Sequence, residues 1–316
     1  MISNIVQDIF INSEINKYYN YSVISKIPNI NNNVIKIIIN EYNKISEIKK
    51  AALPEGLKIL EINGRNIISK IEKDVLPKGL RSLKIDGWNK LSKIEKGVLP
   101  ECLEVLNIDG LNNISQLEKE VLPECLKDLK IYGFNKISKI EKGDLPEGLE
   151  VLKIDGWNNI SKIEKGDLPK GLKKIKIGGH NNISTIEKDV LPKGLKSLDI
   201  RGSNTISKIG FLPKRLEILK LSGENTISEI KNGVLPKSLK TLYIKGRNTI
   251  SEIEQSDLPK SLEKIIISGF NTISKIEESV LMDNLNYLLI TGNNSIDDEK
   301  KRYIVKKYPH IDIYIS

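Results

Sequence analysis

A leucine followed by proline recurs along most of this chain at an almost constant spacing. The pair begins ten copies of one unit, and Leu281, followed by methionine, begins an eleventh. Successive copies lie 23 residues apart, except for one interval of 21. A unit this short cannot bury its own apolar side, so the copies have to stack on one another as a solenoid. The other ten copies begin at Leu53, Leu76, Leu99, Leu122, Leu145, Leu168, Leu191, Leu212, Leu235 and Leu258.

One copy of the unit contains one short strand. Its consensus is LPxGLxxLxIxGxNxISxIEKxV in one-letter code, and positions below are counted from its first leucine. Positions 8 and 10 are aliphatic, and this spacing of two is typical of a strand with one buried face. Each copy therefore adds one strand to a parallel sheet, and the residues between the aliphatic ones face the open, concave side.

Two positions hold the same residue in all eleven copies: glycine at position 12 and asparagine at position 14. The glycine predicts a bend with positive φ, or a close approach of the backbone to the next coil. The asparagine predicts a buried ladder, in which amide side chains hydrogen-bond one coil to the next and satisfy backbone groups of the turn. We interpret both columns as structural.

The other side of each coil carries a Ser-x-x-Glu spacing, as in Ser69 to Glu72 and Ser161 to Glu164. This spacing is a capping box, which predicts a short helical turn. We therefore expect an α/β solenoid of about thirteen coils of 23 residues, caps included, with a parallel sheet on the concave side and short helical turns on the convex side. Neighbouring glutamate and lysine columns on the convex side indicate a solvated surface.

The repeat pattern also divides the chain. Residues 1–52 are expected to form an N-terminal cap with one degenerate coil, because Ile37 and Ile39 fall one period before the first strand. Residues 53–296 hold the eleven repeats, with a kink near 209–212 where the short interval lies. Residues 297–316 are expected to form a capping helix that ends before Pro309, followed by a strand containing Ile311 and Ile313, one period after Leu288 and Ile290.

The string Leu-x-x-Leu-x-Ile-x-Gly-x-Asn-x-Ile resembles the leucine-rich repeat. The opening Leu-Pro-x-x-Leu-x-x-Leu, with Phe-Asn at 134–135 and 270–271, is similar to the FNIP-repeat variety of social amoebae and giant viruses of amoebae. The resemblance implies a partner-binding scaffold without catalytic residues. FNIP proteins often carry an F-box, which implies a role as a ubiquitin-ligase substrate adaptor, but residues 1–50 show no F-box pattern.

Composition excludes several classes of function. The two cysteines cannot make a disulfide framework, and the two histidines show no metal-ligand spacing. Cys102 and Cys125 share one position in adjacent coils, within reach of a disulfide, but we expect free thiols in a reducing cytosol. We expect a monomer with no enzymatic activity, metal or cofactor. The chain has no secretory signal pattern and no apolar run long enough to cross a bilayer, which predicts a cytoplasmic protein.

The concave side carries the candidate binding residues. Position 13 holds five consecutive bulky residues, and lysines at position 9 lie beside aspartates at position 11. Rows of exposed large apolar side chains mark binding sites, and tryptophans are frequent anchors. The alternative is that these side chains seal the coil edge. The candidate residues are Trp88, Leu111, Phe134, Trp157, His180, Lys84, Lys130, Lys153, Lys176, Asp86 and Asp155.

Two kinds of partner fit these columns. The net charge of +9, with 44 lysines among the 50 basic residues, raises the possibility of a nucleic acid or another polyanion. Lysines and stacking aromatics suit a single-stranded nucleic acid, but the aspartates would lie among its phosphates. Mixed charge around aromatic anchors favours a protein partner. The high lysine content also agrees with coding in an AT-rich genome.

Overall fold

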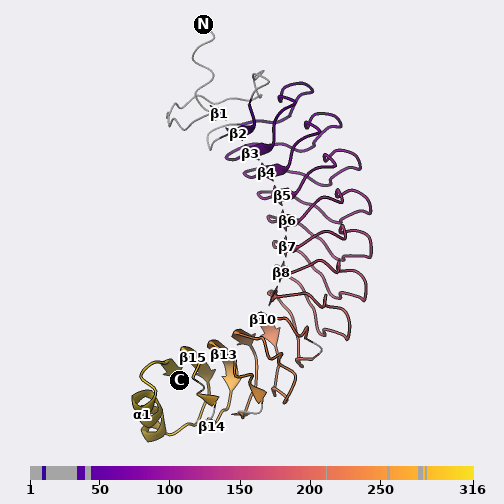
Figure 1. Cartoon of the computed structure of the whole chain (residues 1–316). Coiled ribbons are helices and arrows are strands. Elements are labelled where there is room, and N and C mark those ends of the chain that lie inside the picture. The colour runs from indigo at the N-terminus through magenta and orange to yellow at the C-terminus, as the bar shows by residue number, and fades with distance from the viewer. Residues whose placement is uncertain are drawn as a thin grey trace. The chain divides into compact units, whose positions relative to one another are not determined.

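The computed structural model describes residues 9–11, 34–39, 44–210, 212–254, 257–276, 280–281 and 283–316. The chain forms two compact units, Met1–Asn158 and Asn159–Ser316. Within each unit, Figure 1 shows the strands side by side along one side of a stack of coils and the loops on the other side. One face of each sheet packs on the interior of the coils. We call the other face of the sheet, which is open to solvent, the inner face.

In its described residues, the first unit contains six parallel coil strands and one antiparallel strand. They follow the order β1 to β7 across the sheet, and β1 pairs antiparallel with β2. At the position of the predicted degenerate coil, Ile37 lies opposite Leu60 and Ile39 opposite Ile62. The antiparallel strand was not predicted, and the rest of the expected cap before residue 34, residues 1–8 and 12–33, lies outside the described residues. The strands are β1 Ile9–Ile11, β2 Lys36–Ile39, β3 Ile59–Ile62, β4 Ser82–Ile85, β5 Val105–Ile108, β6 Asp128–Ile131 and β7 Val151–Ile154.

The described part of the second unit contains seven parallel coil strands and a separate two-stranded sheet, β12 and β14, in its loops. Six and seven coil strands agree with the predicted thirteen coils. The strands from β10 to β15 in this sheet are longer than those of the first unit, at six to eight residues. The elements are β8 Lys174–Ile177, β9 Ser197–Ile200, β10 Ile218–Asn225, β11 Thr241–Gly246, β12 Glu252–Ile253, β13 Lys264–Asn271, β14 Lys275–Ile276, β15 Tyr287–Gly292, α1 Asp298–Lys307 and β16 Asp312–Ile315.

Alternation along each strand builds the core. In β4, Leu83 and Ile85 are fully buried, whereas Ser82 and Lys84, which alternate with them, are partly exposed. The same alternation repeats in the next coils, and equivalent positions of neighbouring strands lie opposite one another. Each buried side chain therefore packs on its equivalent in the next coil. The core is therefore a stack of aliphatic layers, and the side chains between them form the inner face.

The glycine after each strand is required by close approach. Gly87 has φ +110°, and a Cβ built on it would lie 1.6 Å from the carbonyl oxygen of Gly64 in the preceding coil. All eleven glycines of this column have positive φ, as the sequence predicted. The coils can stack at strand spacing here only because no side chain stands between their backbones.

The outer loops differ from the prediction. In the described residues Ser69 to Ile71 adopt no helix, and the chain turns at Lys73 and Asp74 instead. Asp74 has φ 61°, and the equivalent residues of other coils, including Gly97, are also left-handed. The loop therefore reverses through one left-handed residue, which leaves no room for the helical turn that the Ser-x-x-Glu spacing suggested.

The shortened coil keeps the sheet intact. Across its 21-residue interval, Leu198 still pairs with Leu219, and Ile200 with Leu221. The two missing residues are therefore absorbed in the outer loop. The boundary between the compact units lies at Asn158, not at 209–212, and the kink there stays a prediction.

Helix α1 and β16 end the second unit. Asp297 caps the helix by accepting a hydrogen bond from the Lys300 backbone N–H, with acidic residues in the first turn and basic residues in the last. Strand β16 pairs parallel with β15, but Leu288 lies opposite Ile313 and Ile290 opposite Ile315. The predicted register, which placed Ile311 opposite Leu288, is wrong by two residues because the coil that contains the helix is longer than one period.

Candidate functional site

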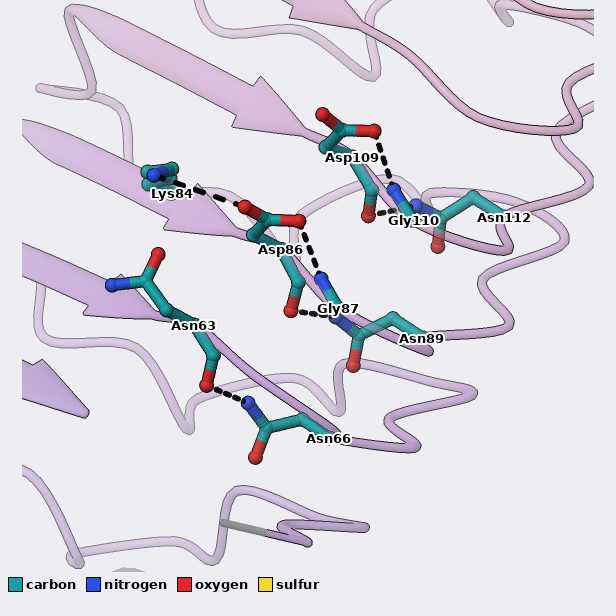
Figure 2. A network of polar contacts seen from close by, with 9 residues as sticks. All are labelled: Asn63, Asn66, Lys84, Asp86, Gly87, Asn89, Asp109, Gly110 and Asn112. Carbon is teal, nitrogen blue, oxygen red and sulfur yellow. Dashed lines mark hydrogen bonds and ion pairs between the residues drawn. The ribbon is translucent and has the colours of Figure 1, made fainter. Parts of the chain in front are cut away.

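The asparagine column lies directly beneath the candidate surface. Asn89 is fully buried, and its Oδ1 accepts a hydrogen bond of 3.0 Å from the Ile68 backbone N–H in the preceding coil. Its Nδ2 donates to the Asp86 carbonyl oxygen at 2.7 Å. Figure 2 shows the same amide-to-carbonyl contact in three successive coils. The bonds join side chain to main chain rather than one amide to the next, so the column holds the turns together.

The aspartates at position 11 are partly used by the same turn. Asp86 Oδ1 accepts a hydrogen bond of 2.6 Å from the Gly87 backbone N–H, and Asp109 and Asp155 make the equivalent bond to the next glycine. The other oxygen of Asp86 lies 3.9 Å from Lys84 Nζ (Figure 2). Asp86 and Asp155, predicted as orienting charges, therefore each have one oxygen committed to the backbone, a role that the sequence analysis missed.

The bulky column at position 13 is exposed in the first unit. Trp88 and Trp157 are each 54% exposed, Phe134 is 43% exposed and Leu111 is 39% exposed. Phe134 and Trp157 make an edge-to-face contact with ring centroids 5.3 Å apart. The Arg65 guanidinium lies 5.6 Å from the centroid of the Trp88 ring. These four apolar side chains, which we call the aromatic column, lie in consecutive coils and remain largely open to solvent.

The other two candidates at this end of the series belong to the second unit. His180 is exposed, and Lys176 is partly exposed in β8. The aromatic column of the first unit therefore consists of four of the five predicted residues. Arg65, which was not a candidate, joins it at the other end. Its place at position 13, one coil before Trp88, is the sequence signal that could have identified it.

Charges on the inner face of the first unit are mixed, with an excess of acid. Lys84, Lys130 and Lys153 are all partly exposed at position 9. Lys130 Nζ lies 2.8 Å from Asp128 Oδ2. At positions 7, 9 and 11 of the coils that contain β2 to β7, the face carries these three lysines and Lys36, whose Nζ lies 3.4 Å from Glu61 Oε1, against five carboxylates. The carboxylates belong to Glu61, Asp86, Asp109, Asp128 and Asp155.

One tyrosine reports this acidic surrounding. Burial raises the pKa of the Tyr132 phenol above its ordinary value, and the nearby charges of Asp155, Asp128 and Asp109 raise the pKa further. Tyr132 occupies position 11, where neighbouring coils have aspartate. The phenol therefore stays neutral at physiological pH and can donate a hydrogen bond at the centre of the face.

The described part of the chain was also searched for reactive cysteines, metal sites and membrane-spanning helices. Cys102 and Cys125 are both free and exposed. Among the described residues, no group of three or more histidine, cysteine, aspartate or glutamate side chains is placed to hold a metal ion. The described helix is too short and too polar to span a bilayer.

Comparison with known proteins places these features in context. The family model described as FNIP Repeat matches residues 42–87, 134–180, 157–203, 204–246 and 225–270, together more than half of the chain. A sequence comparison with curated proteins gives no match.

Similar solved structures are leucine-rich-repeat solenoids. CroV588, a circular leucine-rich-repeat protein of a giant virus, has a TM-score of 0.66 at 25% identity, over 84% of this chain and 42% of that one. YopM from Yersinia enterocolitica has a TM-score of 0.63 at 26% identity, over 87% and 59%. An internalin of Listeria monocytogenes shares the fold, with a TM-score of 0.63 at 20% identity over 89% and 86%. The chain thus spans less than two thirds of the length of the first two.

Proposed function

The chain belongs to the FNIP-repeat family of leucine-rich-repeat solenoids, and from this premise we propose that it binds a protein partner through the aromatic column on its inner face. Leucine-rich-repeat solenoids are typically protein-interaction scaffolds and are generally not enzymes. The proposal adds the surface, its anchors and the chemistry of the partner. Trp88, Phe134 and Trp157 are the anchors, and Leu111 lies in the coil between those of Trp88 and Phe134.

The observation that carries the proposal is the exposure of two tryptophans, a phenylalanine and a leucine in four consecutive coils. Exposing large apolar side chains to water is unfavourable, and a contiguous row of them marks an interaction surface. Burying an exposed tryptophan in a partner pocket stabilises a complex by about 2 kcal/mol or more. Sealing of the coil edge is disfavoured as their role, since they remain more than a third exposed.

The charges favour a protein over a nucleic acid. Four lysines among five carboxylates leave no net positive charge at these positions to attract phosphates, whereas a protein can match both signs at once. Asp86 and Asp155 contribute through their second oxygens, because the first is held by the turn. Lys84, Lys130 and Lys153 serve as orienting cations around the anchors. Lys176 and His180 lie in the second unit, and their part in binding stays a prediction.

The proposal also covers the cellular compartment and the oligomeric state of the protein. We propose a monomeric protein in the cytoplasm, and two free, exposed cysteines in neighbouring coils suit the reducing environment of that compartment. A substrate-adaptor role in ubiquitination is the narrower form of the proposal. It predicts that components of a ubiquitin ligase co-purify with the partner, and their absence from a complex that contains the partner argues against it.

The test is a pull-down from nuclease-treated lysate of the natural cellular context. The variant carries Trp88→Ala, Phe134→Ala and Trp157→Ala, and its fold is checked by circular dichroism. Phe270→Ala is the matched control, because Phe270 is 58% exposed at the same position of a coil in the second unit. We expect one protein to be retained by the wild type and the control and lost by the triple variant. Equal capture by all three, or capture only before nuclease treatment, would contradict the proposal.

A further inference from the structure

The second unit has an inner face of different composition. Its position 9 residues form a row across the sheet, in which register pairs Lys220 with Tyr243, Tyr243 with Ile266, Ile266 with Leu289 and Leu289 with Tyr314. All five side chains point away from the core, because the residues on either side of each are the buried or half-buried members of the alternating strand.

Four of these five side chains are apolar or aromatic and carry no covering element in the described part of the chain. Tyr314 is 56% exposed, and Tyr243, Ile266 and Leu289 are partly exposed. At the usual spacing of about 4.8 Å between strands, the four span roughly 14 Å. Residues on one side of an extended peptide lie about 7 Å apart, so two or three of them fit along this row.

A third aromatic side chain, Tyr287, widens the row. Tyr287, at position 7 of the neighbouring strand, has its ring centroid 5.9 Å from that of Tyr314. Lys264 Nζ lies 4.2 Å from the centroid of the Tyr287 ring, which holds a cation at the edge of the apolar area. Tyr287 and Lys264 also lie on register-paired positions of adjacent strands. The apolar area is therefore continuous and bordered by positive charge.

The sign of the charge is opposite to that of the first unit. Positions 7, 9 and 11 of β10 to β16 carry Lys220, Lys245 and Lys264 against one carboxylate, Asp312. In the described part of the chain, no carboxylate lies within ion-pair distance of Lys220 or Lys245. The next carboxylate along the row, Asp199, is held by two hydrogen bonds from Arg201. This face therefore presents unneutralised cations beside an apolar row.

We infer that this face, formed by Lys220, Tyr243, Lys245, Lys264, Ile266, Tyr287, Leu289 and Tyr314, binds an extended acidic peptide segment that carries aliphatic or aromatic side chains. The peptide's apolar residues lie on the Tyr243 to Tyr314 row, and its carboxylates approach the three lysines. A nucleic acid fits less well, because Ile266 and Leu289 at the centre of the row offer no donor to a phosphate. The site is separate from the aromatic column, so either can fail without the other.

The first experiment selects ligands from a library of random peptides displayed on phage, with the whole chain as bait. We expect the enriched peptides to combine glutamate or aspartate with leucine, isoleucine, phenylalanine or tyrosine. An enriched peptide is then synthesised with a fluorescent label, and its affinity is measured by anisotropy. Enrichment of neutral or basic peptides, or no enrichment over a bait-free control, overturns the inference.

Two variants test the two components of the face. Ile266→Thr with Leu289→Thr removes the apolar centre but keeps residues that favour strands, and Lys220→Glu with Lys245→Glu reverses the rim charge. Each pair should weaken binding of the selected peptide by about tenfold or more, and added salt should weaken binding further. Circular dichroism checks that both variants are folded.

The matched control reverses two exposed lysines in the loops of the same unit, Lys208→Glu and Lys237→Glu, which changes the net charge equally. We expect its affinity to stay within about twofold of the wild type, since neither side chain is on the inner face. Equal loss in the control shows a general charge effect and overturns the inference. So does a single-stranded oligonucleotide that binds as tightly as the peptide and is insensitive to the Ile266 and Leu289 changes.

Discussion

Replacing one buried asparagine of the ladder tests whether its hydrogen bonds stabilise the stack of coils. Asn112 is fully buried; its Oδ1 accepts a hydrogen bond of 3.0 Å from the Leu91 backbone N–H, and its Nδ2 donates to the Asp109 carbonyl oxygen at 2.7 Å. Asn112→Ala leaves both backbone groups without this partner. An unsatisfied buried polar group costs about 1–3 kcal/mol, so we expect a loss of about 3 kcal/mol in the free energy of unfolding.

The chain supplies two controls. Asn113, the next residue, is exposed, and Asn113→Ala should change the free energy of unfolding by less than about 0.5 kcal/mol. Asn204 accepts from the Ile183 backbone N–H, but its Nδ2 has no partner in the described residues. Asn204→Ala should therefore cost about 1.5 kcal/mol, roughly half the cost at Asn112.

Urea denaturation followed by circular dichroism gives the differences in unfolding free energy, and hydrogen exchange gives the local effect. About 3 kcal/mol corresponds to roughly a hundredfold faster exchange of the Leu91 amide in the Asn112→Ala variant, if that amide exchanges by unfolding. Equal stabilities for the Asn112 and Asn113 variants would refute the claim that the ladder bonds stabilise the stack.

Three further outcomes follow from the turns and from the inner face. Gly87→Ala should prevent native stacking, seen as a lost or broadened unfolding transition, because its Cβ meets a backbone oxygen, whereas Gly97→Ala has open space and should cost only about 1 kcal/mol of left-handed strain. Asp86→Ala should lower the free energy of unfolding by about 1 kcal/mol, and Asp86→Asn, which keeps the acceptor for the glycine N–H, by less; urea midpoints compare them. The raised pKa of Tyr132 means that the folded state binds the phenolic proton more tightly than the unfolded state, so stability should fall as pH rises above about 10. Urea midpoints at pH about 9 and about 10.5 should differ less for Tyr132→Phe than for the wild type, and an equal difference would contradict the assignment.

The repeat determined most of the fold because a small number of positions carry strict physical demands. Alternation at Leu60 and Ile62 predicted the strand and its register, since only a strand buries residues two apart on one face. The glycine column predicted positive φ, since the next coil approaches its backbone. These demands are local and repeat in every coil, so one sequence is enough to find them.

The conformation of the outer loops could not be predicted in the same way. Their reversal needs one left-handed residue, and the chain meets that need with different residues, Ala51, Asp74 and Gly97 among them, so no single residue type marks it. The register of β16 was missed because a helix of ten residues lies inside the last coil and lengthens it.

The candidate surface was only partly predictable. Counting equivalent positions in the repeat predicted the row of aromatic residues. It could not show that one oxygen of Asp86 is held by a glycine N–H, because that bond depends on the bend of the turn. Nor could it reveal that the apolar row of the second unit carries unneutralised lysines. The row was recognised from the strand register, which places Tyr243, Ile266 and Leu289 side by side.

The central claim is that a protein partner touches the aromatic column, and photo-crosslinking tests it most directly. p-Benzoylphenylalanine replaces Phe134 in one protein and Lys119, exposed in an outer loop of the same unit, in another. Each is irradiated in nuclease-treated lysate, and the adducts are identified by mass spectrometry. The account predicts one dominant protein adduct from the Phe134 site that is absent from the Lys119 site. Adducts of equal identity and yield from both sites, or none from Phe134, would contradict it.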